Sequence, residues 1–155
     1  HLSHMSIWSH ALQSKKINEN FILILEDDAT FEPYGIENIE LTIDRLMYLE
    51  WDILYLGHGP NLKGTIVYPN ILIPPEYSHP ESRTNCGFWG YVIRTSSIPQ
   101  LISSVKQFET KSIDATIQYY FGKPLKPLFL VKPIVKQSSG YSVRMMIEKE
   151  GTGKV

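Results

Sequence analysis

The chain has 155 residues with 43% apolar and 20% charged side chains, which is ordinary for a globular protein and enough for a substantial core. Its formal net charge is −1 and its lysines and arginines are scattered, so the charge does not favour nucleic acid or an anionic membrane as a partner. Cys86 is the only cysteine, which excludes an internal disulfide and a cysteine-rich metal site.

The first two predicted elements are a helix and a buried strand. Apolar residues at helical spacing predict a helix over residues 5–17. Residues 21–25 form an unbroken apolar run, which is typical of a strand buried on both faces. This strand leads directly into three adjacent carboxylates: Glu26, Asp27 and Asp28.

The three carboxylates at the end of the strand predict a cation site. Side chains alternate along a strand, so Glu26 and Asp28 are expected on one face and Asp27 on the other. Neighbouring negative charges repel one another, and Mg²⁺ or Mn²⁺ would relieve this because both ions prefer carboxylate oxygens. Ligands also bind at the carboxyl ends of strands in open α/β sheets. An acidic cap on the following turn is the alternative, and the triplet by itself does not decide between them.

The middle of the chain alternates helix, strand and loop. A turn around Pro33 precedes a helix over residues 36–49, and a second buried strand follows over residues 51–56. The segment 58–86 is rich in proline, glycine, asparagine and serine and has one extended patch, which is typical of a functional or mobile loop.

The remaining elements continue the alternation. A strand is predicted over residues 87–93, a helix capped by Thr95 or Ser96, a short helix from Ser112 to Phe121, a last strand over residues 128–131, and an irregular tail from Lys136. Strands alternating with helices indicate an α/β fold with a mostly parallel sheet of about four strands. We expect residues 1–155 to form a single domain.

Asp114 stands near the start of the predicted short helix. A carboxylate in the first turn is stabilised by the helix dipole, which is the simpler interpretation. The functional interpretation is a general base at the mouth of a site.

Five sequence pieces resemble glycosyltransferase family 25, the group of lipooligosaccharide and collagen galactosyltransferases. In chain order they are Ser3-His4 with Ile24 to Asp28, Trp51 to Gly57, Gly87 to Ile93, Asp114, and Pro133 to Gln137. The resemblance implies a GT-A-like, Rossmann-related fold and inverting transfer of a sugar, commonly galactose, from a UDP-sugar to a hydroxyl acceptor on a glycan or a collagen-like protein.

The resemblance also assigns roles to residues. Asp28 would bind Mn²⁺ or Mg²⁺ directly, and Asp27 and Glu26 would orient the metal or the donor. Asp114 would act as the catalytic base. The remaining matches are Gln137 as a contact to the donor and Gly57, Trp89 and Tyr91 as residues of a sugar subsite.

The chain departs from the family in two places. Trp89-Gly90-Tyr91 stands where the family often has His-Ala-Tyr, so no role of that histidine is carried over. Only 25 residues precede Glu26, so we expect an N-terminally truncated domain without its nucleotide-binding half. Such a sheet would expose apolar surface where strands are missing, which predicts self-association into a homo-oligomer.

Two other functions stay open at this point: an inactive carbohydrate-binding or scaffold module of the same fold, and a metal-dependent phosphoester hydrolase. No apolar run reaches the roughly 20 residues needed to cross a bilayer, and no signal-peptide pattern is visible. A cytoplasmic protein is therefore expected, or a lumenal one whose signal segment has been removed.

Overall fold

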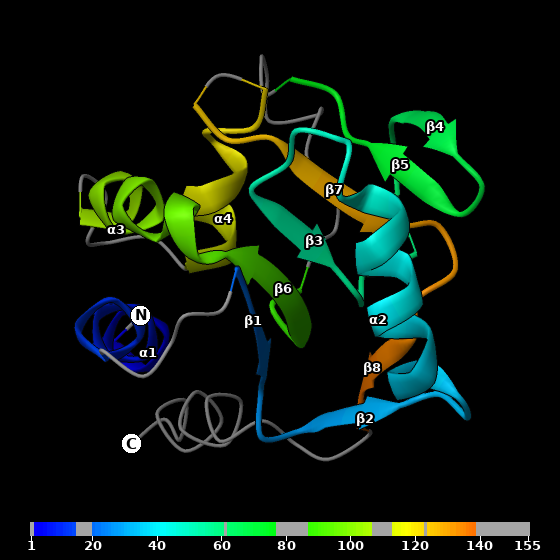
Figure 1. The fold of residues 1–155 in the computed structure, drawn as a ribbon, viewed down its shortest axis with the longest axis horizontal. Coiled ribbons are helices and arrows are strands. Elements are labelled where there is room, and N and C mark those ends of the chain that lie inside the picture. Colours follow the sequence, from blue (N-terminus) through cyan, green and yellow to red (C-terminus); the bar gives the residue numbers. More distant parts are fainter. Residues whose placement is uncertain are drawn as a thin grey trace, which may run out of the picture.

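The computed structural model describes residues 2–14, 20–60, 62–76, 87–106, 113–122 and 124–138 (Figure 1). The helices are α1 (Leu2–Gln13), α2 (Gly35–Leu46), α3 (Ile98–Lys106) and α4 (Ile113–Gln118), with a 3-10 turn, η2 (Thr95–Ser97), before α3. The strands are β1 (Phe21–Leu25), β2 (Ala29–Phe31), β3 (Ile53–Tyr55), β4 (Thr65–Tyr68), β5 (Ile71–Ile73), β6 (Gly90–Arg94), β7 (Pro127–Leu130) and β8 (Val135–Gln137). Cys86 and Ser112 lie outside the described residues.

Six of these strands form one mixed sheet in the order β1-β6-β3-β7-β5-β4. Only β3 and β7 pair in parallel, whereas the other four pairings are antiparallel. The α/β class is confirmed, but the predicted mostly parallel sheet is wrong, and the architecture is not clearly a GT-A Rossmann fold. The reason is the position of β6. β1 and β3 run in the same direction and have α2 between them in the sequence, but β6 lies between them in the sheet and pairs antiparallel with both.

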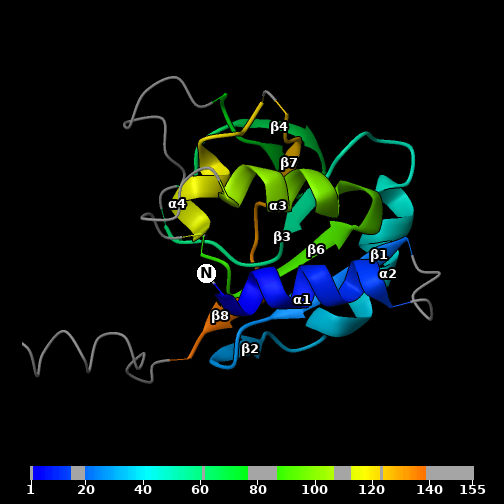
Figure 2. The same cartoon turned by 90° about the vertical axis from the view of Figure 1, so that its left-hand side faces the viewer.

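Helices cover both faces of the sheet. The cluster on one face contains buried residues from α1, α3 and α4, and the cluster on the other contains those of α2. Alternation along β3 explains the division, because Ile53 and Tyr55 belong to the first cluster and Leu54 to the second. Figure 2, turned by 90°, shows α1 and α3 side by side in front of the strands.

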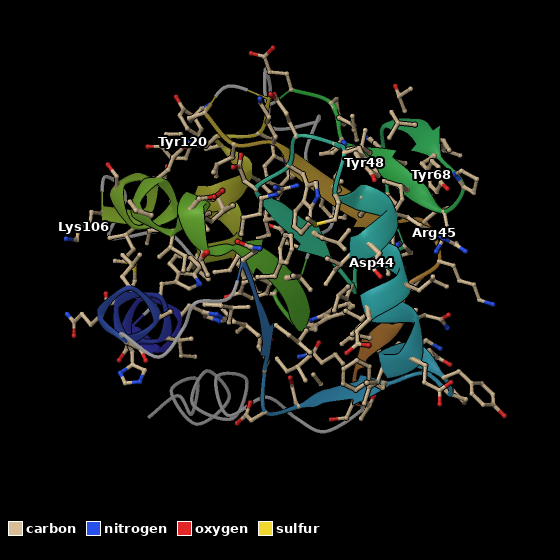
Figure 3. All side chains as sticks on the ribbon, in the orientation of Figure 1. Asp44, Arg45, Tyr48, Tyr68, Lys106 and Tyr120 are labelled. Carbon is tan, nitrogen blue, oxygen red and sulfur yellow. The ribbon has the colours of Figure 1, made fainter. Side chains whose placement is uncertain are left out.

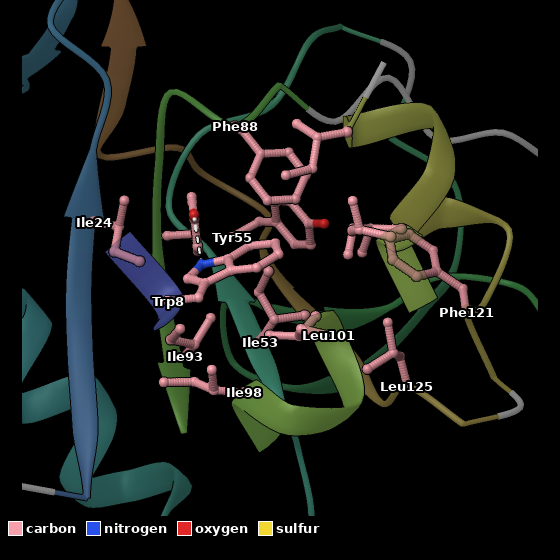
Figure 4. Packing of buried hydrophobic residues seen from close by; sticks show 14 of the residues in the cluster. Trp8, Ile24, Ile53, Tyr55, Phe88, Ile93, Ile98, Leu101, Phe121 and Leu125 are labelled. Carbon is pink, nitrogen blue, oxygen red and sulfur yellow. Dashed lines mark hydrogen bonds between the residues drawn. The ribbon is translucent and has the colours of Figure 1, made fainter. Parts of the chain in front are cut away.

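The core on the α1 side is largely aromatic (Figure 4). Trp8 and Tyr55 are both fully buried, and the ring of Tyr55 stacks on Phe129 with centroids 4.4 Å apart. Phe88 meets Tyr55 edge to face at 5.5 Å. Offset-stacked and edge-to-face contacts are the favoured aromatic geometries, so this cluster fixes α1 and α4 on the sheet.

A second, two-stranded sheet corrects two predictions. Thr30 and Phe31 were expected in the turn around Pro33 and residues 136–137 in an irregular tail, but β2 and β8 pair antiparallel with Ala29 opposite Gln137 and Phe31 opposite Val135. The pairing partners lie more than 100 residues apart in the sequence, so no local sequence pattern predicts that these two strands pair. This small sheet brings the end of the described chain beside the acidic segment.

Several predicted bounds also shift. The helix expected over residues 36–49 begins at Gly35 and ends at Leu46, and the strand expected from residue 87 begins at Gly90. The extended patch at residues 65–73 is a hairpin of β4 and β5. Within the described ranges, no helix is both long and apolar enough to cross a membrane.

Candidate functional site

The acidic turn (Glu26, Asp27 and Asp28) joins β1 to β2. The amide of Glu26 donates a hydrogen bond of 2.9 Å to the carbonyl oxygen of Trp89, which continues the β1–β6 ladder by one residue. The amide of Ala29 then donates to the carbonyl oxygen of Glu26 at 3.1 Å and closes the turn. The three carboxylates are therefore held on a tight connection at the carboxyl end of an edge strand.

Asp28 and Gln137, predicted from separate sequence pieces, lie in direct contact. The amide Nε2 of Gln137 donates to Oδ2 of Asp28 at 2.8 Å, and the backbone amide of Ser138 donates to the carbonyl oxygen of Asp28 at 2.7 Å. The other carboxylate oxygen, Oδ1, is buried and finds no hydrogen-bond partner in the part of the chain that the structure describes. The β2–β8 pairing produces this arrangement, because it places Gln137 opposite Ala29.

Glu26 takes part in a different network, which connects it to α1. Its Oε1 lies 3.3 Å from Nε2 of His4, and Nδ1 of His4 lies 2.8 Å from the hydroxyl of Tyr91. The indole N–H of Trp8 also donates to this hydroxyl, at 3.2 Å. His4 is a site residue that the sequence indicated only through the resemblance; its position one helical turn before Trp8 was the available signal.

Tyr91 lies in the core and not at an open subsite. Its side chain is fully buried, between Trp8 and Phe88. Burial raises the pKa of Tyr91 far above its ordinary value, and the negative charge of Glu26 adds to this effect while the Trp8 hydrogen bond opposes it. The hydroxyl therefore stays protonated, and its hydrogen bonds go to α1.

Gly57 and Trp89 lie together against β8. A Cβ atom at Gly57 would lie 2.5 Å from the carbonyl oxygen of Val135 and 3.1 Å from the ring of Trp89. Trp89 is half-buried and packs against the core on the α2 side. The predicted residues Gly57, Trp89 and Gln137 are thus gathered around β8, where a side chain at position 57 would not fit.

Asp114 does not join this group. It occupies the first turn of α4 and is half-buried. In both ribbon views α4 lies well away from the turn between β1 and β2 (Figures 1 and 2). The structure therefore does not bring the predicted base and the predicted metal ligand to one place, and the first-turn position agrees with the simpler dipole interpretation.

The carboxylates of the acidic turn do not converge on one point, and binding of Mn²⁺ or Mg²⁺ by Asp28 and Asp27 stays a prediction. No cluster of three or more His, Cys, Asp or Glu side chains suited to a metal ion exists among the described residues. Glu26 is directed to His4 and Asp28 to Gln137, so the carboxylates do not converge. Two large grooves, of about 630 and 670 Å³, lie on the two sides of α2, and neither is lined by the acidic turn.

Asp52, from the predicted Trp-Asp motif, has a structural role. Its carboxylate accepts a hydrogen bond from the hydroxyl of Ser97 at 2.5 Å and another from the backbone amide of Lys126 at 2.8 Å. These bonds tie the start of β3 to the turn before α3 and to the start of β7. The motif that contributed to the resemblance therefore serves the fold.

The comparison with protein families overturns the predicted membership of glycosyltransferase family 25. The model that matches is that of the Poxvirus P35 protein, and it covers residues 2–145. No curated protein matches the sequence. The predicted enzyme class, the galactosyl transfer and the links to lipopolysaccharide and collagen glycosylation rested on the other family and are wrong. The chain belongs to the Poxvirus P35 protein family.

Proposed function

We propose that this chain is a non-catalytic recognition module whose acidic turn binds a ligand group that is positively charged or donates hydrogen bonds. The observation that carries the proposal is the state of Asp28, in which Gln137 holds one carboxylate oxygen and the other has no hydrogen-bond partner among the described residues. Leaving a buried acceptor unpaired costs about 1–3 kcal/mol, and a donor from a ligand would recover part of it.

The charge of the turn favours a cationic donor. The turn contains three consecutive carboxylate residues. Within the described residues, the one ion-pair partner of these carboxylates is His4, which lies next to Glu26. Asp27 is exposed, and so is Gln137, whose amide can rotate away from Asp28. A guanidinium or ammonium group can then bond to the released carboxylate, and charge-assisted bonds of this kind are the stronger ones.

The neighbourhood of the turn supports binding without chemistry. Asp114 lies elsewhere, so it supplies no base at the turn, and the hydroxyl of Tyr91 is buried and neutral. Trp89, half-buried beside Gly57, offers a flat apolar surface close to the turn. An aromatic face next to carboxylates suits a guanidinium group, which stacks on rings while its N–H groups bond to oxygen.

An amide-resolved NMR titration with methylguanidinium tests the proposal. We expect shifts at the amides of Glu26 to Ala29 and of Ser138, lost in Asp28→Asn and kept in Glu37→Gln, which removes an exposed carboxylate from α2. The absence of such shifts, or equal shifts in the two variants, would overturn it.

Mn²⁺ and UDP form two further arms of the same titration. Both stay predictions as ligands, now separated from any transfer reaction. Paramagnetic broadening by Mn²⁺ that is confined to the acidic turn, together with no effect of methylguanidinium, would show that the turn binds a metal ion and not an organic cation. UDP shifts that require Mn²⁺ would identify a nucleotide as the ligand.

A further inference from the structure

β1 forms an open edge of the six-stranded sheet. It pairs with β6 over all five of its residues, and its other edge pairs with no strand of the described chain. Asn20 and Glu26 make backbone hydrogen bonds toward the β6 side. Because these bonds alternate along an antiparallel strand, the backbone N–H and C=O groups of Phe21, Leu23 and Leu25 point to the open edge.

A groove of about 670 Å³ lies beside this edge, between β1 and α2. Its apolar lining includes Leu23, Ile36 and Met47, whose side chains are 42%, 62% and 45% exposed. Val92 of β6 belongs to the lining as well. Unpaired backbone groups and an exposed apolar groove thus adjoin each other, which is the combination that strand addition uses.

The charge of the groove selects among occupants. Its charged lining residues are Glu40 and Asp44, both on α2, whereas the neighbouring Arg45 lines the groove on the opposite side of the helix (Figure 3). A second copy of this chain would bring the same acidic residues against one another. An extended segment with lysine or arginine among its apolar residues would neutralise them instead.

The other edge strand of the sheet is less suited to pairing. The register of β4 with β5 shifts between Ile66 and Tyr68, which marks a bulge or irregularity. Such irregularities blunt an edge, because the backbone groups no longer form a continuous row. The register of β1 is unbroken from Phe21 to Leu25.

We propose that the β1 edge and the groove beside it bind an extended peptide segment of a partner protein by strand addition, with apolar residues at alternate positions and basic residues among them. The apolar side chains of the segment would enter the groove beside Leu23, and its backbone would pair with the outward groups of β1. A lysine or arginine of the segment would meet Glu40 and Asp44. This site is separate from the acidic turn and does not depend on the function proposed for it.

The test uses a fluorescent peptide of about five residues, the length of β1, that carries valine, lysine and valine at the alternate positions facing the groove and threonine at the positions between them. We expect saturable binding by anisotropy and shifts of the amides of Phe21, Leu23 and Leu25 in NMR spectra. Leu23→Lys should weaken binding about tenfold or more, because it places a charge in the groove and opposes the lysine of the peptide. Ile66→Lys is the matched control on the other edge strand, where the side chain is also exposed, and should bind as the unchanged chain does.

Two peptide variants separate strand addition from nonspecific attraction. N-methylation of alternate residues removes every second amide donor, and only one of the two possible sets of alternate residues should abolish binding. A peptide in which glutamate replaces lysine should bind about tenfold more weakly or not at all. Equal effects of both methylated sets, or equal weakening by Leu23→Lys and Ile66→Lys, would overturn the proposal.

The remaining outcomes also decide against it. No binding at about 1 mM peptide would show that the edge does not accept a strand of this chemistry. Sedimentation experiments could show a dimer that dissociates in Leu23→Lys. The occupant of the edge would then be a second copy of the chain and not a peptide, in line with the self-association expected from the sequence. Protection of the Phe21, Leu23 and Leu25 amides from hydrogen exchange without any peptide would show that the edge is already covered.

Discussion

The hydroxyl of Tyr91 lies 2.8 Å from Nδ1 of His4, and this contact joins β6, the second strand of the sheet, to α1. Trp8 donates its indole N–H to the same hydroxyl oxygen, so in the neutral imidazole form of His4 the Tyr91 O–H donates to Nδ1. The imidazole Nε2–H then donates to the carboxylate of Glu26. The acidic turn is thereby anchored in the core through one buried chain of hydrogen bonds.

Replacing Tyr91 by phenylalanine should destabilise the protein by about 1–3 kcal/mol at neutral pH, because Trp8 and His4 lose a buried partner. Chemical denaturation monitored by tryptophan fluorescence measures this free energy of unfolding. Tyr48→Phe is the control, since Tyr48 is 95% exposed, and it should leave stability unchanged. A change below about 0.5 kcal/mol in Tyr91→Phe would contradict the role given to the hydroxyl.

The raised pKa of Tyr91 predicts a loss of stability at alkaline pH. Above pH 10 the hydroxyl loses its proton in the unfolded chain but keeps it in the folded one, where burial is the main cause of the raised pKa. The folded state then binds more protons than the unfolded state, so the free energy of unfolding falls as the pH rises, by about 1.4 kcal/mol per pH unit for this group. Between pH 9 and 11 the proton is lost gradually in the unfolded chain, so the total fall in the free energy of unfolding over this range, measured from unfolding curves, should be about 1.4 kcal/mol smaller in Tyr91→Phe. Identical slopes in the two proteins would refute the shift.

Gln137→Glu should destabilise the β2–β8 sheet at neutral pH. The substitution places a second carboxylate at the 2.8 Å contact with Asp28 and removes its hydrogen-bond donor. We expect a loss of about 1–3 kcal/mol that is partly recovered at about 1 M salt, which screens the repulsion between the two carboxylates. Thermal unfolding at low and high salt measures the effect, and Gln137→Met separates the lost hydrogen bond from the charge repulsion. The same recovery at high salt in the methionine variant would argue against the repulsion.

Gly57→Ala should cost about 1–3 kcal/mol, because the added methyl would lie 2.5 Å from the backbone carbonyl oxygen of Val135. The backbone of β8 cannot move without disturbing its pairing with β2. Gly35→Ala is the milder comparison, since its nearest contacts would be 3.1 Å. Gly57→Ala should therefore lower the free energy of unfolding more than Gly35→Ala does. A larger loss in Gly35→Ala would show that the backbone of β8 can move to accommodate the methyl group at position 57.

Asp52→Asn should destabilise the sheet at the start of β3. The amide of asparagine cannot accept from both the Ser97 hydroxyl and the Lys126 amide, so one donor loses its partner at a cost of about 1–3 kcal/mol. Glu50→Gln is the matched control, because it alters an exposed ion pair with Lys126 Nζ that contributes little to stability. Equilibrium unfolding in urea compares the two variants, and equal stability of both would contradict the structural role of Asp52.

Local patterns in the sequence predicted the secondary structure and the α/β class well. The apolar run at residues 21–25 is β1, and the apolar stripes identified α1, α2 and α3 to within a few residues at most ends. These features follow from side-chain periodicity, which depends only on neighbouring residues. The predicted burial of β1 on both faces is wrong, because the strand lies at the edge of the sheet and Leu23 and Leu25 are exposed. Asp28 and Gln137 were both named as site residues, from a resemblance that the family comparison does not support, but their direct contact was not predicted.

What only the tertiary structure decided is the order of the strands and therefore the chemistry of the acidic turn. The insertion of β6 between β1 and β3 makes the sheet mixed, and the pairing of β2 with β8 takes Asp28 to Gln137. Burial of His4 beside Trp8 draws Glu26 toward α1, so three consecutive carboxylates have different partners. The sequence by itself determined that these charges end an apolar strand. Where each one points depends on packing between residues far apart in the chain, which no short motif encodes.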